Sequence, residues 1–518
     1  MPVPLSLATL GDLPEGVARP TYARGDLSAG IVHFGVGNFH RAHLQVYMDR
    51  LMNQGRDLDW AVVGAGVTPY DAAMRDALAP QDWLTTVVEQ EAGSSSARVI
   101  APMTDFLPPM DGAAIEAALA DPAIRIVSLT VTEGGYFIDP ATGAFDPTHP
   151  AIAADAANPQ APKTVFGLIL AGLKARREVG VAPFTVMSCD NVPHNGVVAK
   201  NAVAGLAEAQ DPALAAWVRE NVAFPNAMVD RIAPATSDRE RKICAEEFGI
   251  ADAWPVFCED YIQWVIEDNF PSGRPAWEEV GAQFVPDVTP FEHMKIRILN
   301  GGHAIIAYPS GLMDVHFVHE GMEHPLVRAF LDKIEREEII SILPPVPDTD
   351  LADYFALIER RFSNPKIGDT IRRLALDGSN RQPKFIVPSI ADRLAKDLPV
   401  EGLALESALW CRYCAGVTDS GKPIAPNDPS WDRLNTVALA AKSDPMAWLS
   451  MRDIYGDTAD APAFREAFAR WLHQLDREGL TFSGEAAVSR FLSISAVEWL
   501  EVADCSSRAA CRCQNFAP

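Results

Sequence analysis

Short apolar runs separated by amphipathic stretches dominate the first half of the chain. The run AGIVHFGVG at residues 29–37 is almost continuously apolar and ends in glycines. Similar runs occupy residues 60–66, 83–90, 124–135 and 183–191, and helical stretches such as TVFGLILAGLKARREVG separate some of them. Strands that are apolar along their whole length are typical of parallel sheets covered by helices on both faces. The pattern therefore predicts an α/β domain of the doubly wound, Rossmann type.

The pattern changes after about residue 285. The stretches PLVRAFLDKIEREEII, DLADYFALIERRF, ESALWCRYCAG and PAFREAFARWLHQLDREG repeat apolar residues every three or four positions, which predicts helices. Strand candidates become scarce there. We therefore predict a dinucleotide-binding domain at residues 1–285 and a mainly α-helical substrate and catalytic domain at residues 286–500. Residues 501–518 are expected to form a tail of unknown role.

Length and charge limit the possible functions. A chain of 518 residues is too long for one hydrophobic core, in agreement with two domains. The net charge of −25 repels nucleic acid and anionic membranes, so we expect neither as a partner. The N-terminal stretch MPVPLSLATLGDLPEG lacks a basic start and an apolar core, so no signal peptide is indicated. We expect a cytoplasmic protein that acts on a small molecule.

The cysteines indicate neither a disulfide framework nor a metal site. Eight cysteines are spread thinly through the chain, which suits a reducing compartment. Cys411 and Cys414 have C-x-x-C spacing, but no second pair or histidine follows at the spacing of a zinc site. The C-terminal stretch CSSRAACRCQNFAP is cysteine-rich, and no function is assigned to it. We predict no metal.

A glycine turn follows the first predicted strand. Gly35 and Gly37 lie between that strand and a helical stretch, where a Rossmann turn brings the backbone close to a pyrophosphate. His40 stands in place of the third glycine of the G-x-G-x-x-G fingerprint. A G-x-G alone is also common in simple tight turns. The motif therefore leaves dinucleotide binding and a tight turn both open.

The acid that completes this fingerprint is missing from its usual position. An Asp or Glu at the end of the second strand normally binds the ribose hydroxyls. Here Thr68 and Pro69 occupy that position, Asp71 is the nearest acid and Arg75 is the nearest arginine. The acidic neighbourhood favours NAD over NADP.

Polar residues interrupt an apolar helical pattern in the stretch KIRILNGGH. On an α-helix with about 100° per residue, Glu292 lies near 60°, His303 near 80° and Asn300 near 140° from Lys295. These four residues fit within one arc. They are either a solvated helix face or a proton-transfer site. In a proton-transfer site, a lysine serves as general base and an asparagine donates to a developing alkoxide.

Two glycines follow Asn300. Gly301 and Gly302 each destabilise a helix interior by about 1 kcal/mol relative to alanine. Such glycines usually permit the close approach of a backbone or a ligand. One hypothesis is that they admit the cofactor or substrate, and the alternative is a kink.

Five motifs in order resemble the polyol-specific long-chain dehydrogenase/reductase family. They are SLTVTEGGY, TVFGLILAGL, FTVMSCDNVPHNG, FPNAMVDRIAP and K-x4-N-x2-H starting at Lys295. The resemblance covers nearly the whole chain. It implies an N-terminal Rossmann-type domain, a largely helical C-terminal domain, and an often monomeric, zinc-independent enzyme. The implied reaction is the NAD(P)-dependent interconversion of a polyol and a ketose.

The same resemblance implies a role for each candidate residue. Lys295 is the expected general base, Asn191 and Asn300 the oxyanion hole, and Glu292 the gate of the proton path. Substrate contacts are expected from His303, Arg373 and Asp230. Cofactor contacts are expected from Gly35, Val36, Gly37, Asn38, Phe39, Arg41 and Glu133.

Alternatives to these roles remain open. From the residues alone, Asn191 fits a turn, Arg373 a surface helix charge, and Asp230 an ion pair with Arg231. For the whole chain, the resemblance implies oxidation of D-mannitol to D-fructose with NAD, and its reverse. An arabinitol dehydrogenase or a fructuronate reductase of the same family would carry the same lysine, asparagine and histidine. A non-catalytic dinucleotide-binding redox sensor is the alternative from another class.

Overall fold

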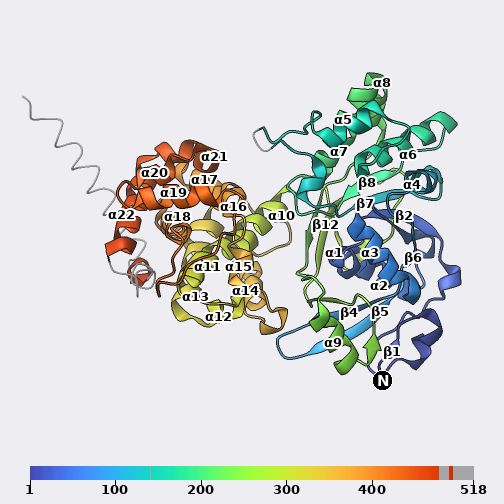
Figure 1. The fold of residues 1–518 in the computed structure, drawn as a ribbon, viewed down its shortest axis with the longest axis horizontal. Helices are drawn as coiled ribbons and strands as arrows, with labels where there is room; N and C mark the ends of the chain where they lie inside the picture. Colours follow the sequence, from blue (N-terminus) through green and yellow to red (C-terminus); the bar gives the residue numbers. More distant parts are fainter. Residues whose placement is uncertain (140–141, 478–488, 494–518) are drawn as a thin grey trace, which may run out of the picture. The chain divides into compact units, whose positions relative to one another are not determined.

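The chain divides into two compact units in the computed structural model (Figure 1). The first unit is Met1–Thr289 and the second is Pro290–Pro518. The structure describes residues 1–139, 142–477 and 489–493. The predicted tail at residues 501–518 lies outside this described part.

A five-stranded parallel sheet forms the centre of the first unit. Its order is β6-β3-β2-β7-β8, and every neighbouring pair is parallel. The strands are β2 (Ala29–Phe34), β3 (Ala61–Ala65), β6 (Met103–Phe106), β7 (Ile126–Leu129) and β8 (Thr185–Ser188). After β2 the chain adds β3 and β6 on one side of this strand, and it then returns to add β7 and β8 on the other side. Such a reversal opens a crevice at the carboxyl ends of the strands, where doubly wound folds bind their ligands.

Helices cover both faces of this sheet, as Figure 1 shows. Val32 and Phe34 of β2 pack into the apolar core that also contains Leu168 and Leu206. Ile31, which precedes Val32 and points to the other side of the strand, packs into the opposite core. The helices of this unit are α1 (Asn38–Ala42), α2 (Leu44–Asn53), α3 (Pro69–Leu78), α4 (Gly112–Ala120), α5 (Pro150–Ala157), α6 (Val165–Val179), α7 (Asn195–Gln210), α8 (Pro212–Asn221) and α9 (Asp238–Glu247).

Further strands of the first unit form smaller sheets. One has the order β11-β4-β5 and another β13-β12-β9, while β1 pairs with β10. Their bounds are β1 (Val3–Pro4), β4 (Thr85–Gln90), β5 (Ser95–Ile100), β9 (Ala227–Asp230), β10 (Ile250–Ala251), β11 (Val256–Glu259), β12 (Gln263–Glu267) and β13 (Gln283–Val285). The strand expected at residues 83–90 therefore exists, but it lies outside the main sheet. The apolar run at residues 83–90 indicated a buried strand, but it could not show which strands this one pairs with.

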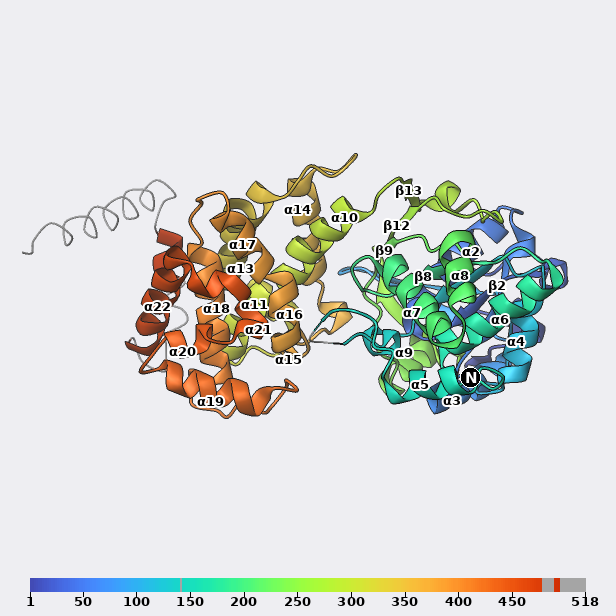
Figure 2. The same ribbon diagram turned by 90° about the horizontal axis from the view of Figure 1, so that it is seen from above.

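Helices build the described part of the second unit, which Figure 2 shows from above. They are α10 (Thr289–Met294), α11 (Gly301–Leu312), α12 (Val318–Glu323), α13 (Pro325–Lys333), α14 (Leu351–Phe362), α15 (Ile371–Leu374), α16 (Gly378–Phe385), α17 (Val387–Leu394), α18 (Glu401–Cys414), α19 (Trp431–Ala441), α20 (Met446–Leu449), α21 (Arg452–Tyr455) and α22 (Pro462–Arg477). Two π-helical segments, η7 (Lys295–Asn300) and η8 (Ile334–Ile339), interrupt the α-helical geometry. An α/β unit and a mainly helical unit confirm the predicted fold class. Among the described residues, no helix is long and apolar enough to span a membrane.

Candidate active site

The two glycines of the turn after β2 have different structural roles. Gly35 has φ +92°, and a Cβ there would lie 2.1 Å from the carbonyl oxygen of Thr130 at the end of β7. A Cβ on Gly37 would meet nothing nearer than the Gly35 carbonyl oxygen at 3.9 Å. Gly35 is therefore required for folding, whereas Gly37 leaves the start of α1 open to a ligand. Val36, between them, is buried.

The histidine that replaces the third glycine belongs to the core. The ring of His40 stacks on that of His33 with 3.3 Å between centroids. His33 hydrogen bonds to Ser128 Oγ at 2.8 Å and Thr130 Oγ1 at 2.9 Å. Burial lowers the pKa of His33 to about 3 and that of His40 well below its usual value, so both rings are neutral. No cluster with the composition of a metal site occurs among the residues that the structure describes.

The predicted cofactor residues of α1 hold this helix against a later segment. Asn38 Nδ2 donates to the Pro234 carbonyl at 2.7 Å, and Arg41 Nη1 donates to the Trp254 carbonyl at 2.6 Å. Arg41 Nη2 also donates to Asn38 Oδ1 at 3.0 Å. Arg41 is completely buried, and Phe39 is half-buried. The contact of these side chains with a cofactor stays a prediction.

Asp71, the acid nearest the end of β3, forms hydrogen bonds with the adjacent turn. Asp71 is buried, and its Oδ2 accepts hydrogen bonds from Val67 N at 3.1 Å, Thr68 N at 2.9 Å and Thr68 Oγ1 at 2.6 Å. A Cβ on Gly66 would lie only 2.3 Å from the Asp71 carboxyl carbon. Asp71 therefore caps α3, and the position expected for the ribose-binding acid holds Thr68 and Pro69.

Asp190 joins the carboxyl ends of β7 and β8. Its two carboxylate oxygens accept hydrogen bonds from Val131 N at 2.9 Å and Thr132 N at 2.8 Å. Burial raises the pKa of Asp190, and the nearby Glu133 raises it further. This junction brings Asn191 and Glu133 to one edge of the sheet, where both are exposed. Their position at the strand ends is the one that a bound dinucleotide requires.

Asn195 connects this edge to Asp230, and the sequence analysis missed it. Its Nδ2 donates to the carbonyl oxygens of Asp190 at 3.0 Å and Ala227 at 2.7 Å, and its Oδ1 accepts from Ala227 N at 2.9 Å. Asp230 is the buried last residue of β9. An asparagine at the start of a helix normally indicates capping, so the sequence carried no signal for this bridging role.

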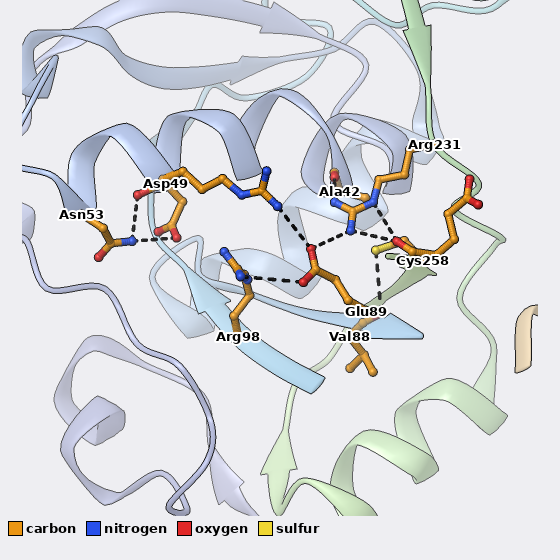
Figure 3. Close-up of polar contacts among 10 residues, drawn as sticks. Ala42, Asp49, Asn53, Val88, Glu89, Arg98, Arg231 and Cys258 are labelled. Carbon is orange, nitrogen blue, oxygen red and sulfur yellow. Dashed lines mark hydrogen bonds and ion pairs between the residues drawn. The ribbon is translucent and has the colours of Figure 1, made fainter. Parts of the chain in front are cut away.

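Arg231 forms an ion pair with Glu89, as Figure 3 shows. The distance from Arg231 Nη2 to Glu89 Oε1 is 2.7 Å, and the Arg231 side chain is completely buried. Arg50 and Arg98 approach the same carboxylate at 3.7 Å each. Arg231 also donates to the Ala42 carbonyl at 2.6 Å. This cluster ties β9 to β4 and α1, and so fixes the strand that ends in Asp230.

In the second unit, Lys295 and Asn300 begin and end a π-helical segment. The expected α-helical geometry, with Asn300 about 140° away from Lys295, is therefore wrong. Hydrogen bonds in a π-helix run from residue i to i+5, so the fifth residue lies about one turn further along. Lys295 and Asn300 are thus brought toward the same face. Both are buried, as is Glu292, so the alternative of a solvated helix face is also wrong.

The two glycines after Asn300 pack against the protein itself. A Cβ on Gly302 would lie 3.3 Å from both Glu335 Oε1 and Phe362 Cε2. A Cβ on Gly301 would lie 3.5 Å from the Phe385 carbonyl oxygen. The hypothesis that these glycines admit the cofactor or substrate is wrong, because neighbouring helices occupy the space. Their small size allows those helices to approach η7 and α11.

His303 lies in a cationic neighbourhood. Its ring stacks on Phe362 with 4.5 Å between centroids. Burial lowers its pKa well below the usual value, and the charges of Arg373, Arg361, Arg381 and Lys295 lower it further. His303 is therefore neutral and offers hydrogen bonds rather than charge.

Arg373 was expected from the sequence, whereas Arg361 and Arg381 were not. Arg373 makes two hydrogen bonds with Asp369, whereas Arg372 donates to the carbonyls of Ala425 at 3.0 Å and Pro426 at 2.8 Å. Only one of the adjacent pair is thus near His303, as the helical spacing predicted. Arg361 and Arg381 lie on other helices, so no local pattern connected them with His303.

The predicted residues form two sets, one in each unit. The second unit groups Glu292, Lys295, Asn300, His303 and Arg373. The first unit carries the glycine turn together with Glu133, Asn191 and Asp230. The second set contains carboxyl, amine, amide, imidazole and guanidinium groups, and the first set contains the glycine turn and three residues at strand ends.

Known proteins resemble the chain along almost its whole length. The family model described as the mannitol dehydrogenase Rossmann domain matches residues 29–279, and that of the mannitol dehydrogenase C-terminal domain matches residues 287–476. Mannitol 2-dehydrogenase of Cereibacter sphaeroides is 58% identical over 93% of this chain and 100% of its own length. That of Neosartorya fischeri is 43% identical over 90% of this chain and 94% of its own length.

Two solved structures share the fold. The Pseudomonas fluorescens mannitol 2-dehydrogenase ternary complex with NAD and D-mannitol has a TM-score of 0.84 at 42% identity, covering 94% of this chain and 99% of that one. A D-sorbitol dehydrogenase in substrate-free form has a TM-score of 0.85 at 34% identity, covering 92% of this chain and 99% of that one.

Proposed function

This chain belongs to the mannitol dehydrogenase family, and on that premise we propose that it oxidises D-mannitol to D-fructose with NAD and catalyses the reverse reaction. The observation that carries the proposal is the π-helical turn that begins at Lys295 and ends at Asn300. It supplies a buried base and a buried amide donor on nearly one face. An alcohol oxidation needs both groups at the same oxygen.

The first unit fits a dinucleotide. The open position at Gly37 leaves backbone accessible at the start of α1, and Asn191 and Glu133 are exposed at the ends of β8 and β7. The predicted contacts therefore come from the glycine turn and this sheet edge. When bound, NAD accepts the hydride that leaves the alcohol carbon.

The other site residues each have a role in the proposed reaction. Lys295 accepts the proton of the reacting hydroxyl, and Glu292 passes that proton toward solvent. Asn300 and Asn191 donate hydrogen bonds to the oxygen as negative charge develops on it. The neutral ring of His303 hydrogen bonds to a substrate hydroxyl. Arg373 and Asp230 bind further hydroxyls, and no proposed step uses a metal.

Replacement of Lys295 by alanine tests this assignment. We expect kcat/KM for mannitol oxidation to fall by about 10²–10⁴-fold, the usual contribution of general-base help. NADH affinity, followed by fluorescence titration, should not change. The exposed Lys242 on α9 provides the matched control, and Lys242→Ala should retain full activity. An unchanged rate in Lys295→Ala would contradict the proposal.

The cations around His303 favour a second candidate, reduction of a hexuronate such as fructuronate. A carboxylate pairs well with an arginine, and Arg361, Arg373 and Arg381 all lie near His303. Turnover of fructuronate with mannitol inert would select this reaction, and arabinitol and sorbitol test the other polyols. Cofactor binding without turnover of any substrate would indicate a redox sensor.

A further inference from the structure

A buried arginine lies in the middle of the π-helical segment η7. Arg297 stands two residues after Lys295 and three residues before Asn300, and its side chain is buried. Two residues correspond to about half a turn of a helix, so Arg297 points away from the face that carries Lys295. The proposed reaction gives no role to this guanidinium, which contacts the protein on the side of η7 opposite to Lys295.

The partners of Arg297 lie on a neighbouring helix, α17. Arg297 Nη1 donates to Ser389 Oγ at 2.7 Å, and Nη2 donates to Asp392 Oδ2 at 3.0 Å. Ser389 is completely buried and lies three residues before Asp392, so both acceptors share one face of α17. A planar guanidinium with two such contacts is fixed in both position and direction. This Arg297 bridge, formed by Arg297, Ser389 and Asp392, therefore ties the centre of η7 to α17.

The hydrogen bonds of η7 depend on its π-helical geometry. The N–H of Gly301 donates to the carbonyl of Ile296, five residues earlier, as in a π-helix. In an α-helix the corresponding bond reaches only four residues back, and Asn300 would lie about 140° from Lys295 around the axis. Turns of π-helix are rare, and rare backbone geometries persist only where surrounding contacts hold them. Loss of such contacts would therefore favour the α-helical register, which separates the base from the amide donor.

We propose that the Arg297 bridge holds η7 in its π-helical register and thereby keeps Asn300 beside Lys295 at the reacting oxygen. Arg297 is a positioning residue, because it acts through Asn300 and touches neither substrate nor cofactor. A displacement of about 1 Å can lower a catalytic rate by about 100-fold, because hydrogen bonds to a developing charge require good alignment. The inference rests on the proposed dehydrogenase function, which gives Lys295 and Asn300 their roles.

A double-mutant cycle in the full-length protein tests this role. In steady-state mannitol oxidation with NAD, Arg297→Met should lower kcat by about 10–100-fold and leave the KM for NAD unchanged. Asn300→Ala alone should lower kcat by about 10²–10³-fold, the usual contribution of an oxyanion donor. The double variant should be no slower than Asn300→Ala, because no amide is left for Arg297 to position. Losses that multiply in the double variant would overturn the proposal.

Milder variants and a matched control come from α17. Ser389→Ala and Asp392→Asn each weaken one contact of Arg297 and should lower kcat by about 2–10-fold, so they test the bridge even if Arg297→Met folds poorly. Arg393 is also a buried arginine of α17, but it donates to two backbone carbonyls of η8, at 2.9 Å and 3.1 Å. Arg393→Met should therefore lower the Tm and leave kcat unchanged.

The possible outcomes separate the bridge from the proposed reaction. Equal loss of kcat in Arg297→Met and Arg393→Met would show an effect of stability alone and overturn the positioning role. A crystal structure of Arg297→Met, which does not depend on turnover, should show residues 295–300 in α-helical geometry, and an unchanged π-helix would overturn the bridge. Unchanged kcat in Asn300→Ala would instead overturn the proposed catalytic site, because the amide donor would then be dispensable.

Discussion

A buried carboxyl in the second unit makes stability depend on pH. Glu406 of α18 is completely buried, and its Oε1 accepts a hydrogen bond from Gln382 Nε2 at 2.6 Å. Burial raises its pKa from 4.5 to about 8. Between these two values the folded protein holds a proton that the unfolded chain has released. Stability therefore falls as pH rises through this window, by about 1.4 kcal/mol for each pH unit.

The variant Glu406→Gln should remove this dependence. Glutamine keeps a carbonyl oxygen for the Gln382 amide and does not ionise. The wild-type penalty is fully absent below about pH 4.5, reaches about 3 kcal/mol at pH 7 and levels off near 5 kcal/mol above pH 8. The variant should therefore gain little at pH 5 and most at pH 8.

Thermal unfolding at pH 5, 6, 7 and 8 measures the difference. For a unit of this size, 1 kcal/mol corresponds to about 2–4 °C in Tm, so the advantage at pH 7 should approach 10 °C. Glu208→Gln is the control, because Glu208 is half-exposed in its ion pair with Arg219. Parallel pH profiles for wild type and Glu406→Gln would refute the claim that this carboxyl is neutral in the folded state.

Two further predictions concern the first unit. Gly35→Ala should lower the Tm of this unit, because its Cβ would collide with the Thr130 carbonyl. Gly37→Ala should fold normally and weaken NADH binding. Normal folding of Gly35→Ala would contradict the packing argument. Arg231→Leu should destabilise the folded protein by about 3–5 kcal/mol, because Glu89 loses its nearest partner and the Ala42 carbonyl loses its donor. Denaturant unfolding measures this loss, with Arg219→Leu as the control at an exposed ion pair. An effect no larger than that of the control would show that the buried pair is dispensable.

Local periodicity determined the fold class, and the motifs that resemble the family supplied the expected roles of the site residues. Apolar runs such as residues 29–37 are long enough to specify buried parallel strands, and the change of period after residue 285 indicated the helical unit. Five motifs in order, among them the one that starts at Lys295, carried the family resemblance, which the two domain matches confirm. These features depend on neighbours in the sequence, so the sequence alone determined them.

Contacts between distant residues decided the rest. The same residues fit an α-helix or a π-helix, and only the structure shows that Lys295–Asn300 is π-helical. Asp71 is the acid nearest the end of β3 in the sequence, and only the tertiary structure shows that its carboxylate accepts a hydrogen bond from Thr68 N. The sequence determined which chemical groups the chain carries. The tertiary structure decided which of them are buried, paired or open to a ligand, because those properties depend on partners far away in the chain.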